Sequence, residues 1–534
     1  MKPVQALLRV LRDEGVTKVF GNPGTTELPF LDALVDAPDI EYVLGVHEGS
    51  VVAMADGYAR ATGRPAFVSL HVAAGLANGL VGLLNASRSR TPLVVTAGQQ
   101  DRRHLSHDPM LSGDLVGLAR AAVKHTFDVR HAHDLPVALR RAFRLAVQPP
   151  AGPVFLSIPM DLLAEDVEVV LPERSTIRPP GPATGVGEAA DVLRAAREPA
   201  IVAGDGVGRS AAVAELVGVA EALGAAVYHQ PFNDGIDFPT AHPLYRGALP
   251  ATHAGIRERL EPHDVVFVVG CHAFMPHHYT PGSPIPAGTR VVQLDDDPSE
   301  PGRNFAVSPG MVGDIRATIA ELAKVLPRSG RTYHRADESE VDFEVPDVRA
   351  PLDPLVAARA VAAGLTEDAV LVEEAITTGV LLRGALRQSR PGSYVHTVGG
   401  GLGSGIGMAV GTRLGDPTRP VVAVLGDGCA LFGVHGLWSA ARCGVPVTFV
   451  VMSNGEYRTL KETLDSWGSR ASEAGRYLGV DLGRLDFTTA ADFFGVPAVR
   501  VDSAKQLHEI VATAGDRHGP LLVDVPITGH QEHP

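Results

Sequence analysis

The stretch VVAVLGDGCALFGVHGLWSAARCGVPVTFVVMSNGEY, at residues 421–457, decides the fold of this chain. Two short apolar segments, residues 421–425 and 447–452, flank a helix-like segment at residues 430–442. Apolar strands that alternate with helices are typical of a parallel sheet covered on both faces. Open sheets of this kind bind ligands just past the carboxyl ends of their strands. Asp427 and Asn454 stand at that place, so the sequence predicts a ligand site there.

The residue types in this stretch indicate which ligand it binds. Gly426 and Gly428 allow the backbone to approach a ligand closely and aim the N-terminus of the next helix at an anion. The Asp427 carboxylate and the Asn454 amide oxygen form a hard oxygen site that suits Mg²⁺ or Ca²⁺. Because two side-chain ligands leave such an ion unsaturated, a phosphate must complete its coordination. The motif therefore predicts a diphosphate held through a divalent metal.

The same alternation of strands and helices occurs in three parts of the chain. Polar or proline-rich stretches at residues 172–186 and 328–347 indicate linkers between these parts. We therefore expect an α/β protein of three domains, at residues 1–172, 187–327 and 348–534. The expected strands are residues 18–20, 42–46, 66–70, 93–97, 154–158, 200–203, 264–269, 290–294, 369–373, 394–398, 421–425, 447–452 and 521–525, and helices are expected at residues 4–14, 51–60 and 430–442.

The first and last thirds of the chain share short motifs in the same order. An Arg-Pro pair precedes a strand at residues 64–65 and again at residues 419–420, and a Gly-Pro pair precedes the final strand of each third. This order favours two homologous parallel-sheet domains that flank a middle domain. The alternative is that strand–helix units converge on such patterns without common origin.

Composition excludes several classes of protein. The chain has 534 residues, a formal net charge of −14 and 47 basic residues that are scattered along its length. We therefore expect no nucleic-acid and no membrane-surface partner. Three cysteines without C-x-x-C spacing indicate a reducing compartment, and no apolar run approaches the roughly 18 residues of a membrane span. These features predict a cytoplasmic enzyme.

The glycine–aspartate motif also carries a resemblance. Gly426-Asp427-Gly428 followed by Asn454 resembles the metal-binding motif of thiamin diphosphate-dependent enzymes, although Ser453 stands where these enzymes usually have a second Asn. The resemblance implies that Asp427, Asn454 and the backbone carbonyl of Glu456 hold Mg²⁺ or Ca²⁺. It also implies that Glu48 is the carboxylate that exchanges a proton with the aminopyrimidine ring. The alternative for Glu48 is a charge partner of a helix N-terminus.

Within that superfamily, the whole chain is most similar to the benzoylformate decarboxylases. The similarity rests on GNPGTTELPF at residues 21–30, LHVAAG at residues 70–75, TAGQQ at residues 96–100 and GGGLG at residues 399–403. By resemblance, Leu402 is the bulky residue beneath the thiazolium ring that bends the cofactor. The implied cofactor-binding residues are Asn22, Pro23, Asn78, Thr377, Thr378, Gly400, Leu402, Gly426, Asp427, Gly428, Cys429, Asn454, Glu456 and Tyr457.

The resemblance also implies a reaction, the non-oxidative decarboxylation of a 2-oxo acid to an aldehyde and carbon dioxide. His71 and His277 would be its acid–base residues, because imidazoles titrate near the working pH. We expect His71 mainly to protonate the first adduct and His277 mainly to serve later proton steps, with His278 as the alternative to His277. Thr25 stands where the family has a Ser that binds the substrate carboxylate.

The expected substrate pocket departs from that of the benzoylformate decarboxylases. His396 and Thr463 replace aromatic residues, whereas Leu111 and Leu460 keep some apolar lining beside Thr25. We therefore expect a 2-oxo acid that is benzoylformate-like but fits a more polar pocket.

The sequence also leaves room for two other functions, a carboligase and a binding module without activity. A carboligase, acetolactate synthase-like or benzaldehyde lyase-like, would capture the same intermediate with a second carbonyl, but acetolactate synthases typically have small residues where this chain has His71. A binding module without activity would require a broken motif, and Glu48, Asp427 and Asn454 are all present. The resemblance further implies a homodimer or homotetramer with active sites at subunit interfaces.

Overall fold

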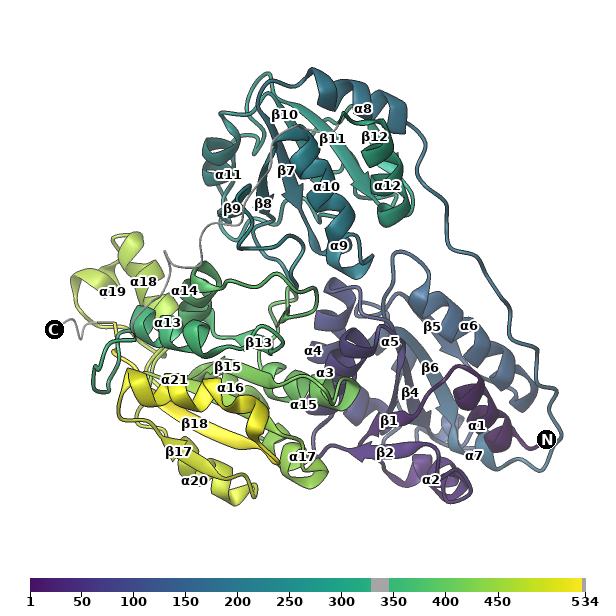
Figure 1. The fold of residues 1–534 in the computed structure, drawn as a ribbon. Coiled ribbons are helices and arrows are strands. Elements are labelled where there is room, and N and C mark those ends of the chain that lie inside the picture. Colours follow the sequence, from purple (N-terminus) through teal and green to yellow (C-terminus); the bar gives the residue numbers. More distant parts are fainter. Residues whose placement is uncertain (328–344, 531–534) are drawn as a thin grey trace. The chain divides into compact units, whose positions relative to one another are not determined.

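The computed structural model describes residues 1–327 and 345–530. The described residues form two compact units, of which the first contains Met1–Ser175, Val345–Ala385 and residues 399–530, and the second contains residues 176–327 and Leu386–Val398. Three six-stranded parallel sheets with flanking helices make up the fold (Figure 1). The predicted α/β class is thus confirmed, while the domain boundaries remain predictions. The linker predicted at residues 328–347 lies outside the described residues up to residue 344.

The first sheet has the strand order β2-β1-β3-β4-β6-β5. Its central strands β3, β4 and β6 are buried along their whole length, which explains their near-continuous apolar sequences. Helix α1 buries one face, with Ala6, Leu7, Val10 and Leu11, against the sheet. The elements are α1 (Pro3–Asp13), β1 (Lys18–Gly21), α2 (Leu28–Leu34), β2 (Glu41–Leu44), α3 (Glu48–Thr62), β3 (Ala66–Leu70), α4 (Val72–Arg88), β4 (Leu93–Gln99), α5 (Leu115–Ala119), β5 (His125–Asp128), α6 (Leu135–Val147), β6 (Val154–Pro159) and α7 (Met160–Ala164).

The third sheet repeats the topology of the first. Its order, β14-β13-β15-β16-β18-β17, becomes that of the first sheet when the strands are counted from β13. This agreement supports the prediction of two homologous domains. The elements are α13 (Pro354–Gly364), β13 (Val370–Glu374), α14 (Ile376–Ala385), β14 (Tyr394–His396), α15 (Gly405–Gly415), β15 (Val421–Gly426), α16 (Asp427–Gly433), α17 (Gly436–Cys443), β16 (Val447–Ser453), α18 (Arg458–Ser466), α19 (Arg470–Glu473), α20 (Phe487–Phe493), β17 (Ala498–Arg500), α21 (Ala504–Ala512) and β18 (Leu521–Pro526).

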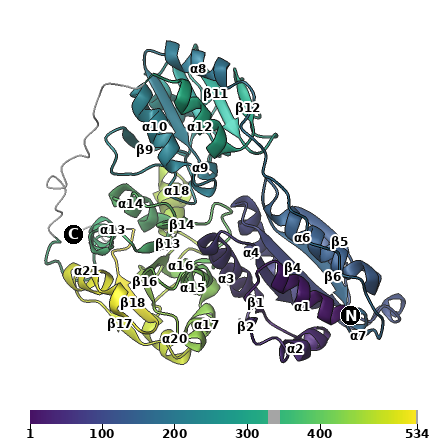
Figure 2. The ribbon, with the colours of Figure 1, turned by 45° about the vertical axis from the view of Figure 1, so that its right-hand side comes forward.

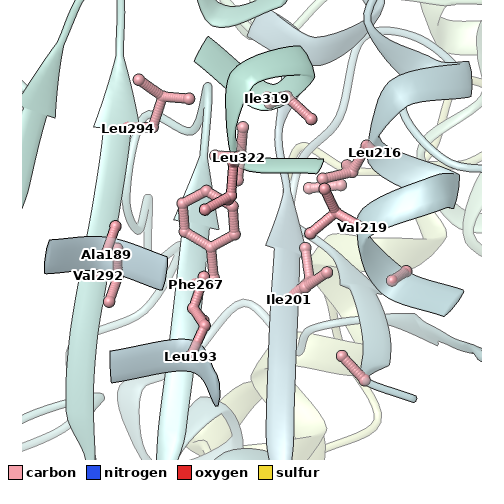
Figure 3. Close-up of a cluster of buried hydrophobic side chains, with 14 of the residues drawn as sticks. Ala189, Leu193, Ile201, Leu216, Val219, Phe267, Val292, Leu294, Ile319 and Leu322 are labelled. Atoms are coloured by element: carbon pink, nitrogen blue, oxygen red, sulfur yellow. The ribbon is translucent and has the colours of Figure 1, made fainter. Parts of the chain in front are cut away.

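The second sheet has a different order, β12-β11-β10-β7-β8-β9, which is that of a doubly wound dinucleotide-binding fold. Phe267 on β10 and Ile201 on β7 form its core with side chains from α8, α10 and α12 (Figure 3). The elements are α8 (Val186–Ala195), β7 (Pro199–Ala203), α9 (Asp205–Arg209), α10 (Val213–Leu223), β8 (Ala226–His229), β9 (Tyr245–Ala248), α11 (His253–Leu260), β10 (Val265–Val269), β11 (Arg290–Asp295), β12 (Gly310–Val312) and α12 (Ile315–Val325).

Within the first unit, the helices α3 and α15 pack side by side, as both views of the ribbon show (Figures 1 and 2). Helix α3 begins at Glu48, and α15 follows the glycine-rich segment that contains Leu402. This pair therefore lies between Glu48 and the loop that contains Leu402. Among the described helices, none is both long enough and apolar enough to cross a membrane.

One predicted helix differs from the structure. The segment expected as a single helix at residues 430–442 is split into α16, which ends at Gly433, and α17, which begins at Gly436. Glycine is a poor helix former, which is consistent with a break at this point. The prediction of one continuous helix was therefore wrong.

Candidate active site

Glu48 is the first residue of α3 and is buried beneath α4. Its carboxylate accepts hydrogen bonds from Asn22 Nδ2 and from Asn78 Nδ2, each at 3.0 Å, one on each carboxylate oxygen. The preceding residue, His47, caps the helix by accepting the backbone N–H of Gly49 at its Nδ1, at 3.1 Å. The structure thus brings together three residues that the sequence predicts at the cofactor, namely Asn22, Glu48 and Asn78.

His71 lies at the start of α4 and contacts a second buried carboxylate. Its Nδ1 is 2.9 Å from Glu27 Oε2 and 3.1 Å from Thr26 Oγ1. Glu27 is 4% exposed and also accepts the backbone N–H groups of Gly24 and Gly98, at 2.9 and 3.0 Å. Because the carboxylate faces Nδ1, it favours the tautomer with the proton there and leaves Nε2 for other partners.

Close packing explains one glycine of the GNPGTTELPF segment. A Cβ atom at Gly24 would lie 2.2 Å from the His71 ring, so no larger residue fits there without moving the imidazole. Thr25 is exposed and begins a short 3₁₀ turn, Thr25–Glu27, next to this ring. Pro23 lies between Asn22 and Gly24 in the same half-buried segment. The sequence segment that carries the resemblance is therefore a scaffold around His71 and Glu48.

Asp427 begins α16 at the carboxyl end of β15 and is 4% exposed. Its Oδ1 accepts the Gly428 N–H at 2.7 Å, and its Oδ2 accepts the N–H groups of Asn454 and Gly455 at 2.9 and 2.7 Å. Burial raises the pKa of Asp427 against the opposing effect of these donors, and Glu456 raises it further. A buried carboxylate in such a position would be stabilised by a divalent cation.

The remaining expected metal ligands follow β16, which pairs with β15 in parallel. Asn454 Oδ1 accepts the backbone N–H of Glu456 at 3.1 Å. The Glu456 carboxylate binds Lys461 Nζ and the N–H of His530. Because the expected metal ligand is the backbone carbonyl of Glu456, its side chain is free to make these contacts. Among the described residues, no three His, Cys, Asp or Glu side chains gather as a metal site. The expected site does not require such a group, because Asp427 is its only ligand of these residue types. The donors present therefore fit a hard cation.

Other expected cofactor residues lie around the same sheet edge. Thr377 Oγ1 is 2.7 Å from Thr459 Oγ1, and Thr378 is buried in α14. Tyr457 packs against Gly428 so closely that a Cβ atom at the glycine would lie 2.6 Å from the ring. Burial raises the pKa of the Cys429 thiol well above its usual range, which disfavours the thiolate, and its place in the cofactor site stays a prediction.

Gly400 and Leu402 belong to a loop at residues 399–405 that leads into α15. Leu402 is half-buried, and Gly400 and Gly403 have positive φ angles of 76° and 95°. Asn85 from α4 and Glu374 from β13 bind the backbone of this loop. Burial is the main influence on Glu374 and raises its pKa to about 7, against three backbone donors that lower it.

The expected pocket residues are spread over several elements. Leu111 is 39% exposed with a φ of 69°, while Leu460 and Thr463 lie on α18, where Leu460 is 51% exposed. His396 ends β14, stacks on Tyr394 with ring centroids 6.3 Å apart, and donates its N–H to the carbonyl of Asp234. That these residues line one pocket stays a prediction.

His277 belongs to the second unit. Its Nδ1 is 3.0 Å from His278 Nε2, and its backbone N–H donates to the Ala251 carbonyl at 2.9 Å. Both rings are exposed, and Phe232 faces His277 edge to face, with centroids 6.4 Å apart. Either imidazole can therefore exchange protons with solvent, and the choice of His277 over His278 stays a prediction.

Sequence reasoning missed three buried polar residues that support the site, namely Glu27, Asn85 and Glu374. Glu27 could have been found, because a Glu three residues after Gly24 is a capping pattern at a turn. Asn85 falls on the buried stripe of α4, where an amide needs a specific partner. Glu374 ends a buried strand and gives no comparable signal.

Three models of known protein families match this chain. Three descriptions match in order: "Thiamine pyrophosphate enzyme, N-terminal TPP binding domain" over residues 1–130, the central domain over residues 186–322, and the C-terminal TPP binding domain over residues 377–525. Thiamine pyrophosphate is the same compound as thiamin diphosphate.

Individual relatives cover the whole chain. A benzoylformate decarboxylase of Pseudomonas aeruginosa is 38% identical over 98% of this chain and 99% of its own length. The solved 4-hydroxybenzoylformate decarboxylase of Rhodococcus jostii RHA1 has a TM-score of 0.90 and 34% identity, with full coverage of both chains. An acetolactate synthase large subunit of Escherichia coli is 27% identical over 99% of this chain and 95% of its own length. The chain therefore belongs to the thiamin diphosphate-dependent enzymes, in the branch that contains the benzoylformate decarboxylases.

Proposed function

We propose that this protein is a carboxy-lyase that decarboxylates a benzoylformate-like 2-oxo acid to an aldehyde and carbon dioxide. The observation that carries the proposal is the contact between His71 Nδ1 and Glu27, which leaves Nε2 of a well-held imidazole for proton transfer. Relatives named as decarboxylases of benzoylformate and 4-hydroxybenzoylformate support an aryl 2-oxo acid as the substrate class.

Thiamin diphosphate, when bound, supplies a nucleophilic carbon and an electron sink that accepts the electrons released with carbon dioxide. Glu48 would exchange a proton with the aminopyrimidine ring, and Asn22 and Asn78 would hold its carboxylate in place, because each donates an N–H group to one of its oxygens. Thr378, Gly428 and Tyr457 would contribute to the cofactor site at the edge of the third sheet.

His71 would donate a proton from Nε2 to the substrate oxygen and recover it later. The Glu27 carboxylate would hold the ring in place through its 2.9 Å contact with Nδ1. Thr25 would bind the substrate carboxylate through its hydroxyl, and His277 would serve the later proton steps. Leu111, His396, Leu460 and Thr463 would line the pocket.

A divalent cation, Mg²⁺ or Ca²⁺, is proposed at Asp427, Asn454 and the backbone carbonyl of Glu456. The support is the buried carboxylate of Asp427, whose pKa burial raises, beside an amide oxygen that follows the neighbouring strand. Asp427→Ala should lose cofactor retention after gel filtration, because the diphosphate would lack its bridging charge. Full activity after exhaustive chelation and dialysis would contradict the metal site.

A homodimer or homotetramer is proposed as the active form. Support comes from α4, whose outer face exposes Ala74, Ala77, Val81 and Leu84 in the spacing of one helix stripe, next to Asn78. Val81 and Leu84 are 46% and 45% exposed, which is unusual for large apolar residues so close to a site. A second copy would cover this stripe. The cytoplasmic location also stays a prediction, supported by three free cysteines.

The alternative function is carboligation. Similarity to an acetolactate synthase is compatible with it, whereas the paired His71 favours protonation over capture of a second carbonyl. A screen of aliphatic, aromatic and hydroxylated aromatic 2-oxo acids, with carbon dioxide and aldehyde measured together, tests the proposal. We expect equal release of both from an aryl substrate. Carbon dioxide with only a hydroxyketone would support the carboligase, and no carbon dioxide from any of them would contradict both.

A further inference from the structure

The loop at residues 399–405, GGGLGSG, contains five glycines and would be mobile as an isolated segment. In the structure, however, two buried side chains bind its backbone. Asn85 is 1% exposed and lies on α4, and Glu374 is 4% exposed and ends β13. Asn85 reaches the loop from the N-terminal TPP binding domain, residues 1–130, whereas Glu374 precedes the C-terminal TPP binding domain, residues 377–525, to which the loop belongs.

Asn85 makes three hydrogen bonds to the loop. Its Nδ2 donates to the Gly401 carbonyl and to Ser404 Oγ, each at 2.8 Å, and its Oδ1 accepts the Gly401 N–H at 3.0 Å. Because Gly401 both donates and accepts, only an amide side chain matches it; a carboxylate lacks the donor. The fit is close, since a Cβ atom at Gly399 would lie 2.4 Å from Asn85 Oδ1.

Glu374 accepts three further hydrogen bonds from the loop. Its Oε1 accepts the N–H groups of Gly403 and Ser404 at 2.9 and 3.0 Å, and its Oε2 accepts that of Gly405 at 2.9 Å. Three N–H donors on two oxygens require a carboxylate, because the amide of Gln would turn an N–H group toward one of the donors. Leu402 therefore lies between residues whose backbone is held by Asn85 on one side of it in sequence and by Glu374 on the other.

Helix α4 also links this loop to Glu48. Asn78, which binds Glu48, and Asn85 are seven residues apart, so they lie on nearly the same face, roughly 10 Å apart along the axis. We propose that Asn85 and Glu374 are positioning residues that clamp the 399–405 loop and so fix the place of Leu402. This inference rests on the proposed function and on the expectation, from the family resemblance, that Leu402 lies beneath the thiazolium ring.

Amide hydrogen exchange of the cofactor-free protein tests the clamp itself. In Asn85→Asp and in Glu374→Gln, the peptide that covers residues 399–405 should exchange about tenfold faster than in the wild type, because local opening needs fewer bonds to break. Gln293→Glu is the matched control, since this buried amide bonds the backbone of Glu300 and Gly302 in the second unit. The control should leave the 399–405 peptide unchanged. Wild-type exchange of that peptide in both clamp variants would overturn the proposal.

The cofactor-loaded protein tests the link to Leu402. Each clamp variant should slow deuterium exchange at the thiazolium carbon by about a hundredfold, the scale of a misplacement near 1 Å, while cofactor affinity changes only a few-fold. In a Leu402→Ala background, the same clamp variants should slow this exchange by less than about a further twofold, because they act through Leu402. An undiminished loss in that background would overturn the link.

The two failures are distinguishable. If Leu402→Ala alone exchanges like the wild type, the role of Leu402 in the proposed function is wrong; if only the clamp variants fail to act, this inference is wrong. Should Asn85→Asp not fold, Ser404→Ala removes a single acceptor of Asn85 and should give a smaller acceleration in the same peptide. No acceleration in Ser404→Ala and in Glu374→Gln would then overturn the clamp.

Discussion

Two buried carboxylates near the first sheet differ in their partners, and this difference fixes their tasks. Glu48 meets only two amide N–H groups, whereas Glu27 meets an imidazole, a hydroxyl and two backbone N–H groups. Glu27 is fully engaged and serves to hold His71. Glu48 is the residue that we expect to exchange a proton with the cofactor.

Glu48→Gln should slow deuterium exchange at the thiazolium carbon by about a hundredfold or more, the usual range for a lost acid–base group. The amide keeps the size of the side chain but cannot hold the proton. Cofactor affinity, measured by fluorescence titration, should change little. Asp56→Asn is the matched control, because this buried carboxylate on the same helix binds Arg60 and Thr91 instead. Equal exchange rates in Glu48→Gln and the wild type would refute the role.

Glu27→Gln should lower turnover by about ten- to a hundredfold, and His71→Ala by about a hundredfold or more. The double variant should be no slower than His71→Ala, because Glu27 acts through the imidazole. Steady-state kinetics of the four proteins measure this. Glu221→Gln, which removes a carboxylate from His242 in the second unit, should leave turnover unchanged. Additive losses would show that Glu27 acts independently of His71.

At the scale of elements, the sequence predicts the strands that are buried on both sides. β3, β4, β15 and β16 are apolar along their length and begin where expected. The strands β5, β9, β12 and β17 were not predicted, because they lie at sheet edges and are partly exposed. β8 was also missed; it is short and next to the edge.

The same contrast holds for the site. Asp427 and Asn454 were predictable because each follows a recognisable strand, so sequence position alone defines their place. Asn85 and Glu374 contact the 399–405 loop across 316 and 29 residues of sequence, respectively. Such contacts depend on the packing of α4 and β13, which no local pattern in one sequence encodes.

Strand β8 ends in a buried histidine, His229, that should make stability depend on pH. His229 accepts the Phe238 N–H at Nε2, at 3.1 Å, and its Nδ1 is 3.0 Å from Tyr245 Oη. Burial lowers the pKa of His229 to about 4, whereas in the unfolded chain it is about 6.5. Below pH 6.5 the unfolded chain therefore binds a proton that the folded chain refuses, and stability falls as the pH is lowered.

The free energy of unfolding should thus drop by about 3 kcal/mol between pH 7 and pH 4 through this group alone. Urea unfolding across this range should show a flatter pH dependence in His229→Asn than in the wild type. Exposed His518 provides the control, since His518→Asn should keep the wild-type slope. Parallel pH curves for the wild type and His229→Asn would contradict the assignment.

At the scale of the whole molecule, two sheets of one topology and a third of dinucleotide-binding order form the enzyme. The apolar stripe on α4 is the surface through which we expect two copies to associate. Leu84→Asp should shift the protein toward monomer in light scattering at micromolar concentration, because it places a charge in the covered face. Val137→Asp changes an equally exposed residue on α6 and should leave the assembly intact. An active Leu84→Asp monomer would refute the need for a second subunit.

The central claim, that His71 directs the enzyme to decarboxylation with release of aldehyde, is tested most directly by the product ratio from benzoylformate. The holoenzyme, with thiamin diphosphate and Mg²⁺, is given benzoylformate alone, and carbon dioxide, benzaldehyde and benzoin are quantified over a single turnover and at steady state. We predict one benzaldehyde for each carbon dioxide in the wild type, and turnover about a hundredfold lower in His71→Ala. Benzoin as the main wild-type product, with His71→Ala as fast as the wild type, would contradict the account and favour the carboligase.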